Sequence, residues 1–397
     1  MNNITDAPLV PITELLEDII DNRGKSCPTQ ETGFPLIATN CIKHSSIYPT
    51  FENIRYVSDE VLQMWFRAEL KSRDILFVNK GTPGRVCLVP DPITFCAAQD
   101  MIGLRADSKK VYYKYLFAIL RSNYIQEKIK NFHVGIAIPH FKKSDMKNLL
   151  IPVPEMGLQI KIGDMYCQLS EKIENNNKIC LELESMAKTI YDYWFLQFEF
   201  PNEDGKPYKS SGGKMVWNEE LKREIPEGWR KGSFADLLEI GNGKDHKELR
   251  DGNIPVYGSG GVMRTVDTSI YNGESVLIPR KGTLNNIIYV NGAFWTVDTM
   301  FYTKMKKAHS AIFAYYSAKL YDFEKLNTGT GVPSMTSSII YNLKIVIPTK
   351  NVLESFDNYV QALYKQMNEK ESENRELVSL RDFLLPLLMN GQVGFRN

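Results

Sequence analysis

Residues 155–195 read EMGLQIKIGDMYCQLSEKIENNNKICLELESMAKTIYDYWF, a proline-free segment with regularly spaced apolar side chains. Alternating steps of four and three residues lead from Ile162 to Trp194, with Asn176 as a polar interruption at the centre. This heptad spacing predicts one long helix that begins after Pro154, runs to about Phe195 and packs its seam against another helix. The predicted seam consists of Ile162, Tyr166, Leu169, Ile173, Asn176, Cys180, Leu183, Ala187, Ile190 and Trp194.

The same seam recurs 194 residues later, with a more polar centre. Its members are Phe356, Val360, Leu363, Met367, Lys370, Asn374, Leu377, Arg381, Leu384 and Leu388. At ~1.5 Å per residue each helix is on the order of 55–60 Å long. We expect the two helices to pair antiparallel, with Asn176 opposite Lys370 and Asn374, because facing polar positions fix the register of a coiled coil. A parallel pair would also bring Asn176 to Lys370, so the direction of pairing is less firmly predicted than its register. The alternative to a coiled coil is that each helix packs only on its own domain.

The segments before the two helices also repeat. Ile138-Pro139-His140-Phe141 aligns with Val332-Pro333-Ser334-Met335 at an offset of 194, and residues 149–154 align with 343–348 at the same offset. Residues 75–82 match 276–283 at an offset of 201, and residues 34–36 match 254–256 at 220. Offsets that change along the chain indicate loop insertions within one duplicated domain.

Each copy contains short strand-like segments punctuated by Gly and Pro. The predicted fold is therefore mixed α/β: two duplicated globular α/β domains at 1–153 and 201–348, separated by two long helices, at 154–200 and 349–397, that form an antiparallel coiled coil. Charge follows the same division. The two domains each contain 19 Lys+Arg and 16 Asp+Glu, a net charge of +3. The first helix segment contains 4 Lys+Arg and 8 Asp+Glu, a net charge of −4, and the second contains 6 and 7, a net charge of −1. Two mildly basic blocks are weak evidence for a nucleic-acid partner.

Composition excludes several other classes. The N-terminus carries Asp6, Glu14, Glu17 and Asp18 without a long apolar core, so we expect no signal peptide, and no apolar run reaches the ~18 residues of a membrane span. The six cysteines form no C-x-x-C pair, and the five histidines are scattered. We therefore expect reduced thiols, no metal site and a cytoplasmic protein.

Several motifs resemble one known family. Residues 198–215, FEFPNEDGKPYKSSGGKM, and Ile225-Pro226-Glu227-Gly228-Trp229 are similar to the inter-domain segment of type I restriction-modification specificity subunits and to the start of their second domain. Lys-Gly-Thr at 80–82 and 281–283 and residues 254–261 look like recurring elements of that family. The resemblance covers essentially the whole chain, in the family's order of domain, helix, domain, helix.

The resemblance implies that the two domains are target-recognition domains, each reading one half of a split, asymmetric target in double-stranded DNA, and that the helices set the unread spacer. It implies two methyltransferase subunits, which use S-adenosylmethionine to methylate adenine N6, and optionally a restriction motor-nuclease subunit that uses ATP and Mg²⁺. It implies a bacterial or archaeal cytoplasmic location, no membrane, and no cofactor in this chain. Residues 79–85 (NKGTPGR) depart from 280–286 (RKGTLNN), so the halves are expected to read different sequences.

An enzyme of this size would carry a recognisable site, and none is found. The sequence lacks an Asn/Asp-Pro-Pro-Tyr/Phe adenine-methylation motif, a phosphate-binding G-x-x-x-x-G-K-[ST] loop and a complete glycine-rich cofactor loop. We therefore expect a non-catalytic recognition subunit. The alternatives are a self-contained DNA methyltransferase or nuclease, which would be active alone, and a coiled-coil scaffold without a DNA role.

Sequence reading requires side chains that reach base edges and others that bind phosphate. Lys80 and Lys281 are candidates for phosphate, as are the backbone amides of the Gly258–Gly261 turn, whereas Arg85, Asn285 and Asn286 suit base edges. A Lys or Asn on a loop is more often simply solvated, and Gly-Thr can serve turn geometry alone. The complete candidate set is Asn40, Lys43, His44, Lys80, Thr82, Arg85, His140, Lys142, Lys143, Ser259, Gly260, Arg264, Arg280, Lys281, Thr283, Asn285, Asn286, Ser334 and Thr336.

Overall fold

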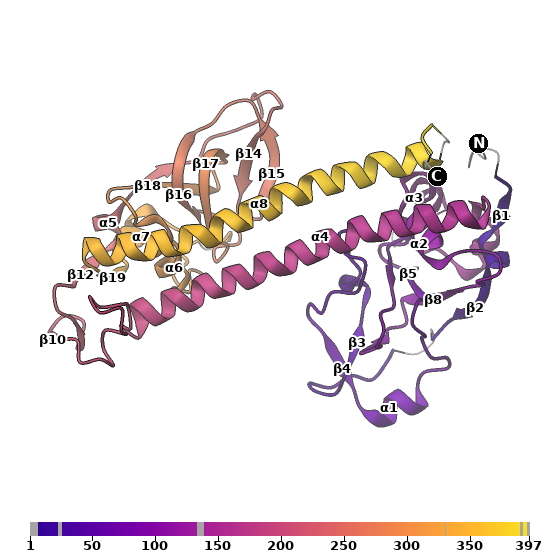
Figure 1. Cartoon of the computed structure of the whole chain (residues 1–397), viewed down its shortest axis with the longest axis horizontal. Helices are drawn as coiled ribbons and strands as arrows, with labels where there is room; N and C mark the ends of the chain where they lie inside the picture. The colour runs from indigo at the N-terminus through magenta and orange to yellow at the C-terminus, as the bar shows by residue number, and fades with distance from the viewer. Residues whose placement is uncertain (1–6, 23–25, 133–138, 330, 390–391, 395–397) are drawn as a thin grey trace. The chain divides into compact units, whose positions relative to one another are not determined.

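The computed structural model describes residues 7–22, 26–132, 139–329, 331–389 and 392–394 (Figure 1). The chain divides into two compact units, of which one comprises residues 1–179 with 369–397 and the other comprises residues 180–368. Each unit contains a globular domain, here domain 1 and domain 2, together with a part of each of two long helices. No helix in the described ranges combines the length and apolarity needed to cross a bilayer.

Domain 1 is built mainly from short strands. They are β1 (Leu9–Pro11), β2 (Leu16–Ile20), β3 (Phe34–Ile37), β4 (Arg55–Val57), β5 (Ile75–Val78), β6 (Val86–Leu88), β7 (Cys96–Ala97), β8 (Met101–Ala106) and β9 (Leu150–Pro152). These form a sheet of order β2-β8-β5-β6, a second of order β4-β3-β7, and the pair β1-β9. Its helices are α1 (Asp59–Met64), α2 (Tyr113–Arg121) and α3 (Asn123–Asn131), with 3₁₀ turns at Ile12–Leu15, Thr39–Cys41 and Lys143–Asn148.

Domain 2 repeats this plan with longer strands. They are β12 (Arg230–Ser233), β13 (Leu238–Asn242), β14 (Ile254–Gly258), β15 (Gly261–Val266), β16 (Tyr271–Pro279), β17 (Ile288–Thr296), β18 (Met300–Met305) and β19 (Lys344–Ile347). A six-stranded sheet has the order β13-β18-β16-β17-β14-β15, and β12 pairs with β19. The hairpin β10 (Met215–Asn218) and β11 (Arg223–Pro226) precedes the domain, and the helices are α5 (Phe234–Leu237), α6 (Ala311–Lys319) and α7 (Ser337–Tyr341).

The predicted duplication is confirmed strand by strand. The antiparallel pair β5–β8 of domain 1 corresponds to β16–β18 of domain 2, and β1–β9 corresponds to β12–β19. In each domain one strand is also paired in parallel: Leu36 with Cys96 between β3 and β7, and Val256 with Trp295 between β14 and β17. A parallel pair at the same place in two otherwise antiparallel domains is a topological detail that two independent folds would rarely share.

The domains differ where proline interrupts a strand. In domain 2 the nine-residue β17 pairs with β16 and β14 and so joins the two halves of one sheet. The matching segment of domain 1 is split into β6 and β7, with Pro90 and Pro92 between them. Proline has no amide hydrogen for the ladder, so domain 1 has two smaller sheets instead of one.

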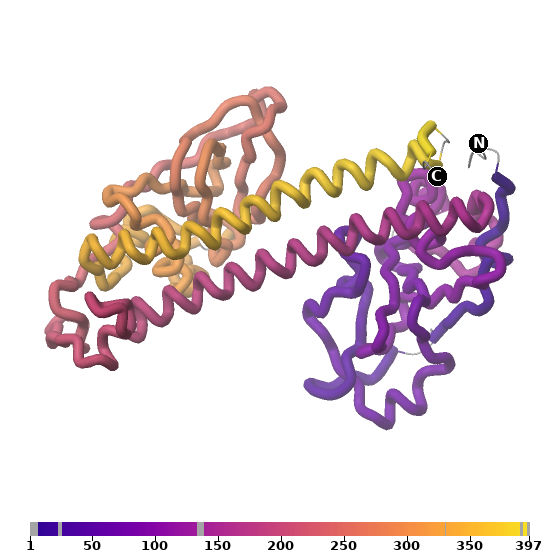
Figure 2. Tube along the Cα trace, in the orientation of Figure 1, coloured from indigo at the N-terminus to yellow at the C-terminus, as the bar shows by residue number. Residues whose placement is uncertain are grey.

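The two long helices are α4 (Met156–Tyr191), which continues into a π-helical turn at Asp192–Leu196, and α8 (Lys350–Met389). Their path is clearest in the tube view (Figure 2). In the unit of domain 1, Arg381 Nη1 donates to Ser170 Oγ at 3.3 Å and Asn176 Nδ2 donates to Asn374 Oδ1 at 2.9 Å. In the unit of domain 2, Cys180 Sγ contacts the Met367 carbonyl at 3.8 Å, and the ring centroids of Trp194 and Phe356 are 5.8 Å apart. Residue numbers rise along one helix as they fall along the other, so the pairing is antiparallel in both units.

The seam positions predicted from the heptad spacing face inward. None of the following is exposed: Ile162, Leu169, Ile173, Asn176, Leu183, Ile190, Phe356, Leu363, Met367, Lys370, Asn374, Leu377 and Leu384. The helices also pack on the domains, because Ile162 and Leu388 join the core around Phe117 of domain 1, and Phe356 joins that of domain 2. The expected boundaries after 153, 200 and 348 fall in the connections before α4, after its π-helical turn and before α8. The compact units, by contrast, divide within both helices because each helix segment shares a core with its neighbouring domain.

Candidate nucleic-acid interface

The Lys-Gly-Thr loop that follows β5 in domain 1 and β16 in domain 2 is built identically. Gly81 N donates to Pro139 O at 3.0 Å, and Gly282 N donates to Pro333 O at 3.1 Å. The two glycines have φ of +84° and +88°, a left-handed conformation that other residues adopt only with strain. The glycine of the motif therefore has the same structural role in both domains: it allows a sharp turn that brings this loop against a second loop.

The second loop is the one that carries His140 in domain 1 and Ser334 in domain 2. Isolated bridges join Lys80 to His140 and Lys281 to Ser334. Directly beneath, Phe141 N donates to Asn79 O at 2.8 Å, and Met335 N donates to Arg280 O at 2.9 Å. The Phe141 and Met335 side chains are buried and anchor both loops to the core.

The lysines at these loops are free to bind an external anion. Lys80 and Lys281 are exposed, and neither side chain has an ion pair or hydrogen bond within the described part of the chain. Thr82 and Thr283, each two residues later, are exposed as well. Unpaired cations beside exposed hydroxyls suit contact with a phosphate backbone.

In domain 2 a third loop joins the same surface. The two-residue turn Ser259-Gly260 connects β14 to β15, and Asn286 Nδ2 donates to Ser259 O at 2.8 Å. Gly282 lies so close to Ser259 that a Cβ on it would approach Ser259 Oγ to 2.7 Å. We call this three-loop surface face 2. It comprises Ser259, Gly260, Lys281, Thr283, Asn286 and Ser334.

In domain 1 the loop that follows β3 takes the corresponding place. Leu88 N donates to Ile47 O at 2.8 Å, which brings this loop beside β6 and Arg85. The imidazole pKa of His44 is lowered to about 4, first by desolvation and then by the positive charges of Arg121 and Arg381, so the ring is neutral near pH 7. The ring can then donate or accept a hydrogen bond but adds no charge. We call this surface face 1. It comprises Lys43, His44, Lys80, Thr82, Arg85 and His140.

Some predicted contact residues have partners inside the protein instead. Asn40 Nδ2 donates to Glu52 O at 2.8 Å, and Lys43 pairs with Glu52 at 2.9 Å. Arg264 pairs with Asp251 at 3.0 Å, and Asn285 Nδ2 donates to Asp322 at 3.1 Å. Contact of these side chains with DNA would first require that an existing bond be broken.

The other candidates lie at the edges of the two faces. Lys143 is 3.8 Å from Asp21, Arg280 lies over the Phe301 ring at 5.9 Å, and the Thr336 hydroxyl accepts from Ile339 N at 3.4 Å as the N-cap of α7. Lys142 is exposed at the start of the 3₁₀ turn. Residues 133–138, which precede Pro139 in the sequence, and residue 330, which precedes Pro333, lie outside the described residues.

Sequence reasoning missed the apolar side chains beside face 2. Val262, Met263 and Val332 are 61%, 59% and 62% exposed. The Met263 sulfur would lie 2.6 Å from a Cβ on Gly258, so Met263 lies against the base of the same hairpin. A signal was available for Val262 and Met263, because both follow the Gly260-Gly261 pair of a predicted turn, and turns lie at the surface.

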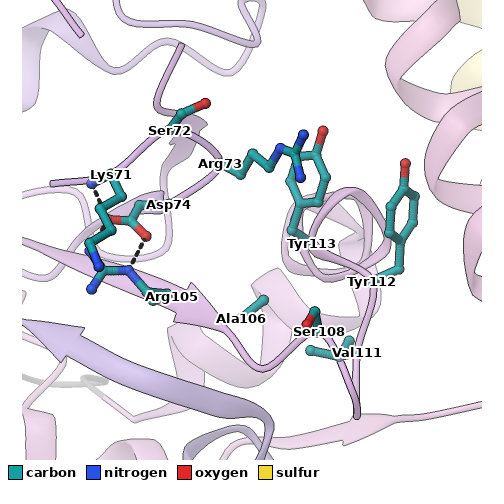
Figure 3. Close-up of a pocket in the computed structure, with 10 residues that line it drawn as sticks. All are labelled: Lys71, Ser72, Arg73, Asp74, Arg105, Ala106, Ser108, Val111, Tyr112 and Tyr113. Atoms are coloured by element: carbon teal, nitrogen blue, oxygen red, sulfur yellow. Dashed lines mark hydrogen bonds and ion pairs between the residues drawn. The ribbon is translucent and has the colours of Figure 1, made fainter. Parts of the chain in front are cut away.

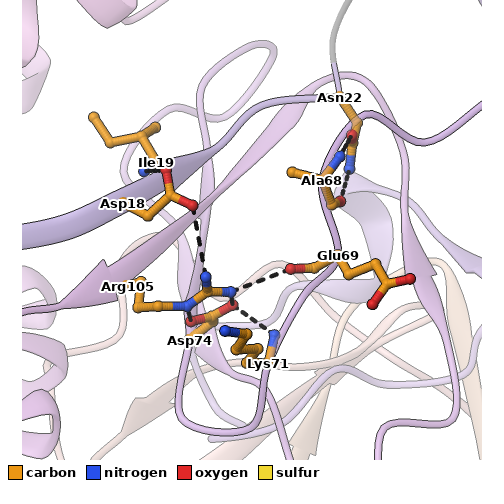
Figure 4. A network of polar contacts seen from close by, with 8 residues as sticks. All are labelled: Asp18, Ile19, Asn22, Ala68, Glu69, Lys71, Asp74 and Arg105. Atoms are coloured by element: carbon orange, nitrogen blue, oxygen red, sulfur yellow. Dashed lines mark hydrogen bonds and ion pairs between the residues drawn. The ribbon is translucent and has the colours of Figure 1, made fainter.

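A pocket of about 270 Å³ lies at the other end of β5, away from the Lys-Gly-Thr loop (Figure 3). Arg73 lies over the Tyr113 ring at 5.7 Å, and the one carboxylate of the lining is Asp74. Asp74 accepts from Arg105 Nε at 2.9 Å and Nη2 at 2.8 Å and from Lys71 N at 2.7 Å (Figure 4). This carboxylate is therefore occupied in holding β5 to β8. In the described ranges no three His, Cys, Asp or Glu side chains are grouped as a metal site.

Comparison with known proteins gives consistent matches. The chain is 24% identical to the type I restriction enzyme MjaIX specificity subunit of Methanocaldococcus jannaschii, over 80% of this chain and 77% of that protein. It is 21% identical to the type I restriction enzyme HindI specificity subunit of Haemophilus influenzae, over 82% of this chain and 87% of that protein. A crystal structure of a type I restriction-modification system S subunit from M. genitalium superposes with a TM-score of 0.62 at 18% identity, covering 98% of this chain and 99% of that one.

The family model described as type I restriction modification DNA specificity domain matches residues 17–185 and 226–371, once for each copy of the duplicated domain. Together these ranges span most of the chain, and each includes a domain and a part of the long helix that follows it. The chain therefore belongs to the type I restriction modification DNA specificity domain family.

Proposed function

We propose that this chain is the DNA sequence-specificity subunit of a type I restriction-modification complex, and that each domain reads one half of a two-part asymmetric target. The observation that carries the proposal is the matched loop pair in both domains, in which Gly81–Pro139 and Gly282–Pro333 bonds present Lys80 and Lys281 without a side-chain partner among the described residues. Two equivalent cationic loop surfaces in one chain suit two similar contacts with one polyanion.

The chemistry of the two faces supports a division of roles. Lys80 and Lys281 would contact phosphate, which positions the protein without reading sequence. Asn286, through Oδ1 and the Nδ2 hydrogen that is not donated to Ser259 O, and His44 would contact base edges, because an amide or a neutral imidazole offers both a donor and an acceptor. Met263 and Val262 would contact thymine methyl groups, the apolar feature of the major groove. Since faces 1 and 2 present different side chains, the two half-targets would differ.

The chain would act as an adaptor within a larger assembly. Two methyltransferase subunits would bind the helical region and carry S-adenosylmethionine, and a restriction subunit would supply ATP- and Mg²⁺-dependent cleavage. The assembly would operate in the cytoplasm of a bacterium or archaeon. A self-contained methyltransferase or nuclease and a scaffold without a DNA role receive no support, because the matched family is one of DNA specificity domains.

The decisive experiment is methylation mapping of a host genome that carries the complete operon. The expected result is adenine methylation at one split motif with a gap of constant length, and none when this chain alone is deleted. Methylation that persists without this chain, or activity of the isolated chain with S-adenosylmethionine or Mg²⁺, would contradict the proposal.

A further inference from the structure

The loop of face 1 that carries Lys43 and His44 is closed at its base. Thr50 N donates to Cys41 O at 2.8 Å, and the Thr50 hydroxyl donates to the same carbonyl at 3.3 Å. We call residues 41–50 the reading loop. Because its two ends are joined, its conformation is set by the few contacts made between them.

The central contact comes from the long helix α4. Glu174 Oε1 accepts hydrogen bonds from Ser46 Oγ and Ile47 N, and from Tyr48 N at 3.5 Å. Ile47 is fully buried, and its carbonyl accepts from Leu88 N of β6. One helix carboxylate therefore holds the segment that directly follows Lys43 and His44.

A second contact is weaker. Arg121 Nη2 of α2 donates to Lys43 O at 3.4 Å, near the limit of a hydrogen bond. Its guanidinium is buried over the Phe117 ring at 5.1 Å, and its Nε and Nη1 atoms have no hydrogen-bond partner among the described residues. Arg121 therefore makes a long contact with the loop, comparable to that between Tyr48 N and Glu174, and does not replace the bonds from Ser46 Oγ and Ile47 N to Glu174.

The place of Glu174 on α4 is set by the helix pair. It lies between Ile173 and Asn176, which are both buried in the seam against α8. The neighbours in the seam fix the direction in which the Glu174 side chain leaves the helix, so a shift of the helix pairing would also shift the contact between Glu174 and the loop. The position of the reading loop therefore depends on the seam of the helix pair.

Domain 2 has no equivalent contact in the described residues. The residue at the same offset of 194 is Asn368, which is exposed on α8. The side chains of α8 that reach the sheet include Gln361, whose Nε2 donates to Glu274 of β16 at 2.8 Å, and Tyr364, whose ring centroid is 4.8 Å from that of Tyr289 of β17. The β14–β15 hairpin is held by β17 instead. The two reading surfaces are therefore supported in different ways.

We propose that Glu174 is a positioning residue for reading the first half-target: it holds the reading loop at a position fixed by the helix pair, whereas the second half-target is read independently of any helix carboxylate. This inference rests on the proposed function. It predicts an asymmetry between the halves that neither the duplication nor the shared Lys-Gly-Thr loops would suggest.

The test compares Glu174→Ala, Glu174→Gln and the control Glu182→Gln in the complete complex, by methylation mapping of cognate sites and sites with one mismatch. Glu182 is an exposed carboxylate on the same helix without a partner in the described residues. Glu174→Ala is expected to lower discrimination by about tenfold at base pairs of one half only, since hydrogen bonds to a charged group are lost. Glu174→Gln, which keeps an acceptor oxygen, should recover most of this loss, and Glu182→Gln should keep the parental base preference in both halves. Asn286→Ala, which removes the proposed base contact of face 2, should lower discrimination in the other half only.

A merely structural role gives a different result. If Glu174→Ala lowers methylation without relaxing any base preference, or relaxes both halves equally, the inference is overturned. It is also overturned if both Glu174 variants retain the parental preference. A parental complex that methylates no two-part motif would instead refute the proposed function, so the two failures are distinguishable.

Discussion

Asn176 and Asn374 face each other across the helix pair, with Asn176 Nδ2 donating to Asn374 Oδ1 at 2.9 Å. Asn176 Nδ2 also donates to Glu373 at 3.1 Å, and Asn374 Nδ2 donates to Asn177 at 2.8 Å. Asn176 is fully buried, and its Oδ1 has no partner among the described residues. A buried amide in an apolar seam is tolerated only where its donors are met, so this pair selects one register.

Asn374→Leu should therefore destabilise the protein. The Asn176 amide would lose a partner inside the seam, which costs about 1–3 kcal/mol. The measurement is urea unfolding, with Asn175→Leu, an exposed neighbour on α4, as the control. Equal stability of the Asn374 variant and the parent would show that the pair does not set the register.

The double variant Asn176→Leu/Asn374→Leu should recover the stability lost in the single variant, because no unpaired amide is left in the seam. It should also lose specificity of pairing, which is measured as a mixture of oligomeric states by light scattering. A uniquely monomeric double variant would indicate that the remaining seam is sufficient.

Phe356 anchors α8 in domain 2, with its ring centroid 4.8 Å from that of Phe195 and 5.8 Å from that of Trp194. It is fully buried, so Phe356→Ala should cost about 3–5 kcal/mol of unfolding free energy through lost burial and a cavity. Phe383→Ala is the matched control, because Phe383 lies on the same helix and is 64% exposed. A similar loss in both variants would mean that the cavity is not the cause.

Lys80→Ala and Lys281→Ala should each weaken DNA binding by the assembled complex and reduce its salt dependence. Each lysine would neutralise one phosphate, so the slope of log K against log salt should fall by about one. Lys109→Ala is the control, because Lys109 is exposed near the pocket at the opposite end of domain 1. Unchanged slopes for both variants would place the phosphate contacts elsewhere.

The length of the helix pair should determine the gap between the half-targets. Residues 177–183 and 367–373 are facing heptads, and removing both would keep the seam continuous while shortening each helix by about 10 Å. At ~3.4 Å per base pair the gap should shrink by about three base pairs, measured by methylation mapping. A gap of unchanged length would show that the helix pair does not set the distance between the half-targets.

His309 links α8 to the start of α6, with Nδ1 2.7 Å from Asp357 Oδ2. This hydrogen bond raises the pKa of His309 above its ordinary value. A raised folded-state pKa adds stability that is fully present below about pH 6.5 and is lost as pH rises through the folded pKa. The Tm difference between the parent and His309→Gln should therefore be largest below about pH 6.5 and shrink as pH rises above that value. A Tm difference that grows with pH would show that folding lowers the pKa of His309 instead of raising it.

The sequence predicted the domain order, the two helices and their seam, because a heptad repeat is a local pattern whose meaning does not depend on the rest of the chain. It also predicted that Asn176 would meet Asn374. It did not predict α2 or α6. Tyr113–Arg121 has an amphipathic period, but its 9 residues are fewer than the window over which such a period is recognised. Ala311–Lys319 is apolar on most faces and shows no amphipathic period. Such helices are recognised only when the surrounding core is known.

The tertiary structure decided which of the candidate loop residues act together. Spacing along the chain paired Lys80 with Lys281, but only the folded loops bring Lys80 to His140 and Lys281 to Ser334, across 60 and 53 residues of chain. Side-chain type alone could not show that Lys43 is held by Glu52, that Arg264 is held by Asp251, or that Glu174 reaches the reading loop. The physical reason is that a helical seam is determined by near neighbours, whereas a polar side chain becomes free or engaged only through contacts between residues far apart in sequence.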